Sequence, residues 1–500
     1  MTGYIQSDAM ITGSMLYDLI SCPHRVTMDL FADPADRDEV SPFIRMLWEK
    51  GASHERDIVG GIGVPFLNLS GFQLDEKERL TTKAMIRREP LIYNGRITAN
   101  DLLGEPDLLR LTNHGYVAGD IKSGAGEEGR EDLSKPKVHY GVQVALYNDI
   151  LERKGLSAGR TPFIIDINGQ EVTYNLDEPY GTRNPTTLWA EYQAALAEAR
   201  AIVSHQEETL AAYGSTCKLC WWYSACTKKL AADDDLTLLP ELGRTKRNAM
   251  FSQIESVAAF AEINVESFIN GKRTLFPGIG PDTLRKLHER ARLVSSTNPQ
   301  PYLSAPLVLP HSDIEVFFDI ETDPMRDFCY LHGMLERHGG DNSTERFDAF
   351  FATDLSVEAE RDAFAAAWAY LCARPRAIIY FYSKYEQTIW RVLQRKYPDV
   401  CSADDIEALF HPSRSIDLYY DVIQKATMWP TRDHSIKTLA RFLGFQWRDT
   451  DPSGAASIEW FDQWVRTGDP SIRQRILDYN EDDCRATRVL LDGIRGLAER

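Results

Sequence analysis

The spacing of apolar positions changes along the chain, and each change predicts a different kind of element. Apolar residues recur every three to four positions over 14–30 and 44–59, which predicts amphipathic helices. Between residues 91 and 120, short apolar runs separated by turn sequences predict antiparallel strands. Helical spacing over 140–151 and 187–213 then flanks two strand-like runs, FIIDIN and QEVTYN. The pattern indicates a mixed α/β domain.

A second alternation begins after residue 310. The run EVFFDIET predicts a buried strand, and further strands are expected at CYLHGML, ERFDAFFA and AIIYFYS. Helical spacing covers 357–372 and the run YEQTIWRVLQRKY, so strands and helices alternate as in a mixed α/β sheet. Between the two alternating regions, residues 240–294 predict several short helices.

The length of 500 residues exceeds what one hydrophobic core supports, so at least two domains are expected. A short charged segment at 231–235 and a proline-rich segment at 298–310 are the natural boundaries. We therefore predict an N-terminal α/β domain over 1–233, a helical middle segment over 234–305 and a C-terminal mixed α/β domain over 306–500.

Composition is that of a globular protein, with 43% hydrophobic and 26% charged residues. No run of 18 apolar residues occurs and the N-terminus lacks the pattern of a secretory signal, so we expect a cytoplasmic protein without a membrane segment. The net charge of −18 argues against a protein that binds nucleic acid over its whole surface. It is compatible with acidic metal sites beside one basic groove. Solvated helix faces are the simpler explanation of the local basic clusters, which are Lys135 with Lys137, residues 244–247, and Arg285, Lys286, Arg290 and Arg292.

A first group of catalytic candidates follows the predicted antiparallel strands. Asp107 ends the turn GEPD, and the run Asp120-Ile-Lys122 lies on the next strand. Residues i and i+2 of a strand share a face, so Asp120 and Lys122 project together, with Asp107 beside them. Two carboxylates suit Mg²⁺ or Mn²⁺, which activates water, and a lysine stabilises developing phosphorane charge. The group has the outline of a nuclease site.

Two further features extend this group. Gln143 and Tyr147 are four residues apart, hence on one helical face, and His54 is a possible nitrogen ligand from an earlier helix. Considered singly, Tyr147 is expected to be a core residue and His54 a surface histidine. Together and in this order, they resemble the signatures of the RecB-type subset of the PD-(D/E)XK nucleases over about residues 10–230. The resemblance implies metal binding by His54, Asp107 and Asp120, catalysis by Lys122, and support of the site by Gln143 and Tyr147.

Three cysteines, Cys217, Cys220 and Cys226, form a compact ligand set, and Cys22 is the best fourth ligand. One N-terminal and three C-terminal cysteines around a nuclease fold resemble the iron–sulfur nucleases, which include the CRISPR-adaptation and AddB-type proteins. The resemblance implies a structural four-iron–four-sulfur cluster. Zinc is the alternative, and unligated thiols are the simplest case.

The middle segment contains the run Leu275-Phe-Pro-Gly-Ile-Gly280, which resembles the hairpin of a helix-hairpin-helix module. Gly278 and Gly280 would let backbone amides approach a phosphate. A plain glycine turn between helices explains the run equally well.

The C-terminal region carries a second acidic group. Asp319 and Glu321 share one face of a strand, and Tyr479 and Asp483 lie four residues apart in a run expected to open a helix. Carboxylates from a strand and a distant helix can clamp two Mg²⁺ ions, with Tyr479 orienting the attacking water. A solvent-facing strand is the alternative for Asp319 and Glu321 alone.

The pattern over 312–497 resembles the DEDDy-type 3′–5′ exonucleases of the RNase H-like superfamily. The second motif departs from that family, because Glu386 stands where an aspartate is usual. Asp417 and Asp482 are secondary candidates. The combination of both regions resembles a family of RecB-like nucleases with a C-terminal RNase H-like domain.

We therefore expect a metal-dependent nuclease that cuts DNA, single-stranded or at ends, and trims 3′ ends. The alternatives are a nucleic-acid-binding adaptor with one or both sites inactive, and an RNA exonuclease. Asp107, Asp120 and Lys122 together favour the nuclease. No Walker A sequence is present, so a helicase would be a separate partner, alongside repair or defence proteins.

Overall fold

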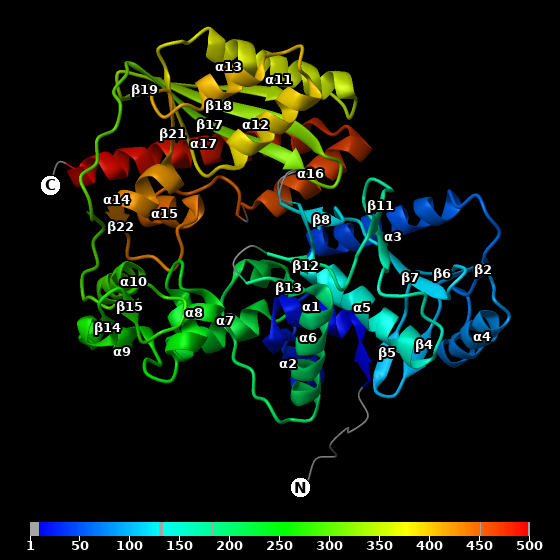
Figure 1. Ribbon diagram of the computed structural model, residues 1–500. Coiled ribbons are helices and arrows are strands. Elements are labelled where there is room, and N and C mark those ends of the chain that lie inside the picture. The colour runs from blue at the N-terminus through cyan, green and yellow to red at the C-terminus, as the bar shows by residue number, and fades with distance from the viewer. Residues whose placement is uncertain (1–9, 130–133, 182–183, 451, 499–500) are drawn as a thin grey trace. The chain divides into compact units, whose positions relative to one another are not determined.

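The computed structural model describes residues 10–129, 134–181, 184–450 and 452–498. The chain divides into two compact units, residues 1–228 and 229–500 (Figure 1). Among the described residues, every helix is too short or too polar to cross a lipid bilayer. The expectation about a secretory signal rests partly on residues 1–9, which lie outside the described residues.

Helices of the first unit begin and end where the sequence supplies caps. They are α1 Gly13–Ser21, α2 Pro23–Phe31, α3 Pro42–Gly60, α4 Leu74–Ile86, α5 Val138–Arg153 and α6 Leu188–Val203, and α7 Tyr223–Ala232 follows at the boundary of the units. Thr12 caps α1 by accepting a hydrogen bond from the amide of Met15. The helix predicted to reach residue 213 ends ten residues earlier, because the backbone turns left-handed at His205 (φ 55°).

A six-stranded sheet forms the centre of the first unit, in the order β11-β10-β7-β6-β3-β2. Its strands are β2 Leu67–Asn68, β3 Leu91–Tyr93, β6 Leu108–Leu111, β7 Tyr116–Ile121, β10 Phe163–Ile165 and β11 Glu171–Thr173. A smaller sheet contains β1 Ile11–Thr12, β4 Ile97–Ala99 and β5 Leu102–Gly104. Strand β7 is buried throughout, and Gly119 in it is required because a Cβ there would lie 2.2 Å from the Phe163 ring. Helix α5 packs on β7 and is buried from Tyr140 to Leu151.

The second unit begins with a helical segment that has its own apolar core. It contains α8 Gly243–Met250, α9 Val257–Glu262, α10 Pro281–Val294 and a small hairpin of β14 Ile269–Asn270 and β15 Arg273–Thr274. Two arginines of the predicted solvated basic clusters are buried instead. Arg247 pairs with Asp235, and Arg290 pairs with Glu241, both at 2.9 Å. These two guanidinium groups are buried in ion pairs and are not available to phosphate.

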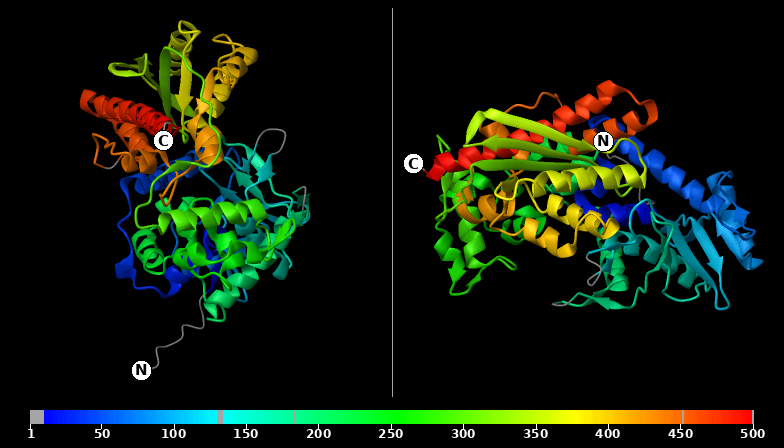
Figure 2. Two further views of the ribbon diagram at one scale, coloured as in Figure 1. Left: turned by 90° about the vertical axis from the view of Figure 1, so that its left-hand side faces the viewer. Right: turned by 90° about the horizontal axis from the view of Figure 1, so that it is seen from above.

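A five-stranded mixed sheet, in the order β19-β18-β17-β20-β21, forms the rest of the second unit. Its strands are β17 Ile314–Asp323, β18 Phe328–His338, β19 Asp341–Phe351, β20 Ile378–Phe381 and β21 Ser415–Asp417. One face packs against α11 Val357–Cys372, α12 Tyr385–Lys396 and α13 Ala403–Leu409. The opposite face packs against α15 Ile436–Phe442, α16 Gly454–Thr467 and α17 Pro470–Ala498. Figures 1 and 2 show α17, in red, running beside the strands.

One local prediction in this unit is wrong. The run from Tyr479 to Asp483 does not open a helix, because α17 begins nine residues earlier at Pro470, where Asp469 accepts the amide of Ser471. The proline-rich segment in which the second boundary is predicted contains a short strand. Its residues β16 Tyr302–Leu303 pair antiparallel with β22 Thr427–Met428, which adds backbone hydrogen bonds to the second unit.

Candidate functional site

The first group of catalytic candidates converges around the end of β7. Asp107 precedes β6, and its Oδ2 atom accepts the backbone amide of Ile121 at 2.7 Å. Asp120 is buried on β7 and forms an ion pair with Lys122. The pleat of β7 and the antiparallel pairing of β6 with β7 bring these side chains together, as the sequence predicted.

Helix α5 holds Lys122 from the other side. The Nζ atom of Lys122 donates to Oε1 of Gln143 at 2.9 Å, and Nε2 of Gln143 donates to the Tyr147 hydroxyl at 2.9 Å. Tyr147 is buried and packs against the backbone at Gly104, where a Cβ would lie 2.7 Å from its ring. A relay of two hydrogen bonds therefore connects the ammonium group to a rigid, buried helix.

Electrostatics around these residues are dominated by negative charge. Burial, followed by the charge of Asp120, raises the pKa of Asp107 well above its usual range. Burial lowers the pKa of Lys122, but the attraction of Asp120 outweighs it, so the pKa is raised overall. Lys122 therefore stays charged, and its single positive charge faces two carboxylates, those of Asp107 and Asp120.

The predicted third ligand, His54, lies on α3. Its Nε2 atom is 3.0 Å from the backbone oxygen of Asp166, and it does not form a group with Asp107 and Asp120 whose ligand atoms all lie within 4.8 Å in the described part of the chain. The adjacent Glu55 accepts the Tyr93 hydroxyl at 2.8 Å, and its charge contributes to the raised pKa of Asp107. Glu55 is thus a charged neighbour of Asp107 that the sequence reasoning missed.

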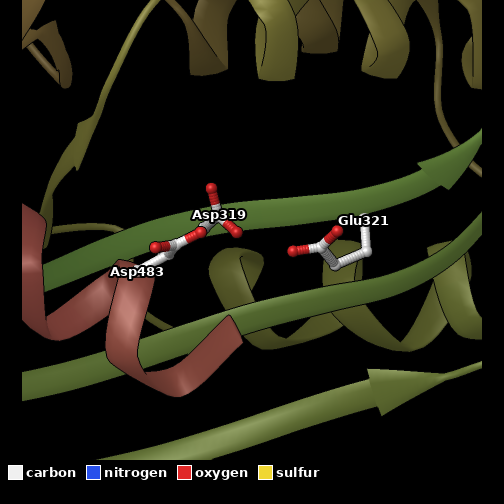
Figure 3. A group of neighbouring side chains, drawn as sticks. All are labelled: Asp319, Glu321 and Asp483. Atoms are coloured by element: carbon white, nitrogen blue, oxygen red, sulfur yellow. The ribbon is translucent and has the colours of Figure 1, made fainter. Parts of the chain in front are cut away.

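The carboxylates of the second acidic group lie close to one another. Asp319 and Glu321 on β17 and Asp483 on α17 each offer an oxygen within 4.8 Å of the others, and Figure 3 shows the three carboxylates between this strand and this helix. Tyr479 lies one turn before Asp483 and is buried. The structure therefore brings together the four residues that the sequence singled out, from segments about 160 residues apart.

Residues 28–227 match the family model of the PD-(D/E)XK nuclease superfamily, and residues 316–494 match that of the RNase H superfamily. The chain is a fusion of these two domains. No curated protein matches it. Because both domains belong to superfamilies of nucleases, the comparisons support a hydrolase of phosphodiester bonds. They confirm the predicted α/β fold class of each domain.

In the RNase H domain, three residues that were not predicted hold the acidic group in place. Asn480 donates to Oδ2 of Asp319 at 2.7 Å, and the indole of Trp447 donates to Oδ1 of Asp483 at 2.7 Å. Lys437 on α15 donates to the Tyr479 hydroxyl at 2.9 Å and lies 3.5 Å from Asp483. Trp447 and Lys437 lie more than 30 residues before the Tyr479–Asp483 run, so no local spacing could have identified them, whereas Asn480 lies inside that run, next to Tyr479.

The donor set of the RNase H domain fits a divalent cation. Burial, followed by the charge of Asp483, raises the pKa of Glu321 to about 8 and that of Asp319 well above its usual range. Glu386, at the start of α12, is also buried with a raised pKa, and its Oε2 atom has no hydrogen-bond partner among the described residues. Buried carboxylates without compensating charge are the ligands that Mg²⁺ and Mn²⁺ prefer.

The secondary candidates have other partners. Asp482 pairs with Arg448 at 2.9 Å, so it faces away from the acidic group. Asp417 accepts the amides of Ser383, Tyr419 and Tyr420 and caps the segment that follows β21. Its charge nevertheless raises the pKa of Glu386. Both residues therefore have structural contacts that the sequence did not predict.

The four cysteines of the predicted cluster line one pocket of the PD-(D/E)XK domain. Cys22 lies between α1 and α2, and the other three belong to the segment before and within α7. Asp29 on α2 accepts both indole N–H groups of Trp221 and Trp222 at 2.8 Å, which brings the two segments together. The convergence of Cys22 with Cys217, Cys220 and Cys226 is thus built into the fold.

The middle-segment glycines do not lie between two helices. Gly278 has φ 77°, which favours glycine, and Gly280 immediately precedes α10, but the element before them is the two-residue strand β15. The arrangement departs from a helix-hairpin-helix module and from a plain turn between helices. A side chain at Gly278 or Gly280 would meet open space.

Proposed function

We propose that the chain is a metal-dependent nuclease whose PD-(D/E)XK domain cleaves DNA and whose RNase H domain removes nucleotides from 3′ ends. The observation that carries this proposal is the group of three carboxylates from Asp319, Glu321 and Asp483 within 4.8 Å of one another. Such a group is costly to bury, because like charges repel in a poorly hydrated site. A cation offsets that cost, which supports a catalytic role for the group.

In the RNase H domain, Asp319, Glu321, Asp483 and Glu386 would hold the cations. A bound divalent cation supplies Lewis-acid activation of water and of the phosphoryl group. Tyr479 would orient the attacking water. Because Lys437 donates a hydrogen bond to the Tyr479 oxygen, the hydroxyl hydrogen of Tyr479 points away from Lys437. Lys437 would thereby fix the direction of that hydrogen bond and act as a positioning residue.

In the PD-(D/E)XK domain, Asp107 and Asp120 would hold the cation, and His54 would become the further ligand by exchanging its contact with the backbone oxygen of Asp166 for the metal. Lys122 would stabilise the charge that develops on the phosphoryl oxygens. Gln143 and Tyr147 would keep its ammonium group aimed at the reacting atoms, through the relay described above.

We further propose that Cys22, Cys217, Cys220 and Cys226 bind a four-iron–four-sulfur cluster that joins the two ends of the PD-(D/E)XK domain. Sulfurs around a tetrahedral zinc ion lie about 3.8 Å apart, given Zn–S bonds of about 2.3 Å. In the described residues, no three of these sulfurs all lie within 4.8 Å of one another. The four cysteines that line one pocket support a metal centre there, and zinc is the alternative to the cluster.

The test is a cleavage assay on the full chain with Mg²⁺ or Mn²⁺ and 5′-labelled single-stranded DNA and RNA. Asp120→Asn is expected to lower endonucleolytic cutting, and Asp319→Asn the 3′-end ladder, each by about 100-fold or more. Asp75→Asn on α4 and Asp362→Asn on α11 replace exposed carboxylates of the same domains and should leave both activities intact. Unchanged cutting in both site variants would exclude these sites, and binding without any cutting would indicate an adaptor.

A further inference from the structure

A groove beside the acidic group of the RNase H domain has no role in the chemistry proposed above. It has a volume of about 400 Å³ and lies between the end of α15 and the loop before α16. Its lining residues are Arg441, Gly444, Phe445, Gln446, Trp447 and Asp449.

One residue in the wall of this groove is hydrogen-bonded to the acidic group. Trp447 lines the groove and donates its indole N–H to Asp483 at 2.7 Å. Lys437, which contacts Tyr479, lies 5.7 Å from the centre of the Trp447 ring. A molecule in the groove would therefore lie next to the reacting centre.

The groove also contains an exposed arginine, Arg441. Arg441 is exposed, its guanidinium lies 5.5 Å from the Trp447 ring centre, and within the described part of the chain it forms no ion pair. By contrast, Arg448 in the same loop pairs with Asp478, Glu481 and Asp482. The carboxylate in the lining, Asp449, pairs with Arg475, so in a protein of net charge −18 the guanidinium of Arg441 suits a phosphate.

An aromatic side chain completes the groove. The half-buried ring of Phe445 meets the ring of Trp447 edge-on, with centroids 4.9 Å apart. This contact fixes the orientation of the Phe445 ring. An unpaired nucleobase can stack on such a ring, whereas a base inside a duplex already has both faces covered by its neighbours.

We propose that this groove binds a nucleotide of an unpaired strand next to the scissile phosphate, with Arg441 at its phosphate and a base on Phe445. The inference rests on the proposed exonuclease function of the same domain. It adds the surface that would receive a single-stranded end and two residues, Arg441 and Phe445, that would select it.

The first experiment maps contact without catalysis. The full chain carrying Asp120→Asn and Asp319→Asn is irradiated with single-stranded DNA or RNA containing 5-iodouracil, and adducts are located by mass spectrometry. Adducts on the peptide that contains Phe445 and Trp447 are expected. Adducts only in other peptides would overturn the inference, and the comparison of DNA with RNA identifies the preferred strand.

The second experiment measures kinetics in the Asp120→Asn chain, where the RNase H domain acts alone. Arg441→Gln should raise KM for a single strand about fivefold to tenfold with little change in kcat, and flatten the salt dependence by about 0.7 in logarithmic slope. Arg441→Lys should restore most of the loss. Phe445→Leu should raise KM about fivefold or more, because it keeps the apolar packing and removes the stacking face.

Arg376→Gln is the matched control. Arg376 is exposed and precedes β20, so it lies at the opposite end of that strand from Glu386, which follows it. An unchanged KM and salt slope in Arg441→Gln, with cutting still lost in Asp319→Asn, would overturn this inference alone. Absence of cutting in the parent chain together with adducts in the groove would overturn the exonuclease function and leave the binding site standing.

Discussion

Asn480 on α17 occupies the space that a side chain at Gly333 on β18 would need. A Cβ at Gly333 would lie 1.7 Å from Oδ1 of Asn480, and Asn480 in turn donates to Asp319. Gly333 is paired with Asp319 across the sheet. The glycine therefore allows the helix to approach the strand closely enough for Asn480 to hold the carboxylate.

Gly333→Ala should displace Asn480 and thereby loosen Asp319. We expect a loss of about 1–3 kcal/mol in the free energy of unfolding and a fall of about tenfold in 3′-end cutting, although no charge is altered. Chemical denaturation and the ladder assay measure the two effects. Gly496→Ala, on the same helix but in open space, should cause neither effect, and equal behaviour of the two variants would contradict the argument.

Lys437→Met should lower kcat for 3′-end cutting by about tenfold with little change in KM, because the lysine acts through Tyr479 and not on the substrate. Lys437→Arg should recover part of the rate, since it restores the donor. Lys384→Met serves as the comparison, because Lys384 lies over the Tyr420 ring in the same domain. A rise in KM alone would indicate that Lys437 binds the substrate.

Gln143→Leu should impair the PD-(D/E)XK domain without unfolding it. The substitution keeps the buried volume of α5 and removes the acceptor that holds Lys122. We expect endonucleolytic cutting to fall about tenfold to 100-fold while 3′-end cutting by the other domain is unchanged. Gln170→Leu replaces an exposed glutamine of the same domain and should have no effect. Full activity of Gln143→Leu would show that the relay does not matter.

Acidic pH should destabilise the RNase H domain through His332. This residue is buried against Trp390, and burial lowers its pKa to about 3. Its unfolded pKa is about 6.5, so protonation favours the unfolded chain as pH falls below that value, and the stabilisation present at neutral pH is lost progressively towards the folded pKa. Between pH 7.5 and 5.0 the loss is about 2 kcal/mol.

The measurement is urea unfolding at both pH values in EDTA, for the parent chain and for His332→Gln. The difference between their free energies of unfolding should shrink at pH 5.0, because glutamine does not titrate. His311→Gln, at an exposed position, should leave the pH dependence unchanged. An identical pH dependence in the parent and His332→Gln would contradict the assignment.

Cys217→Ser should remove the proposed cluster. Anaerobically purified parent protein is expected to be brown and to contain iron, whereas the variant should lose colour and iron and melt about 5–10 °C lower. Cys372→Ser, at the exposed end of α11, should keep both. A colourless parent protein with one zinc per chain would show that the site binds zinc and not iron. A parent protein without metal would show that the thiols are unligated.

The sequence by itself determined most of the elements and the pairs of site residues that are close in the chain. Asp120 with Lys122, Gln143 with Tyr147, and Tyr479 with Asp483 follow from the repeats of strands and helices, which are local properties of the backbone. The limits of α11 agree with the predicted range because the cap at Ser356 and the end of the apolar run are also local.

Only the tertiary structure decided which distant residues complete each site. Trp447 and Lys437 contact the acidic group through the packing of α15, α17 and the intervening loop. Asn480 is next to Tyr479 in the chain, but it reaches Asp319 only because α17 packs on β17, and no spacing in the chain records that packing. The same holds for Arg247 and Arg290, whose charges look solvated in the sequence and are buried in ion pairs in the fold. Side-chain partners depend on which surfaces meet in space, and a linear pattern contains that information only where the partners are neighbours in the chain.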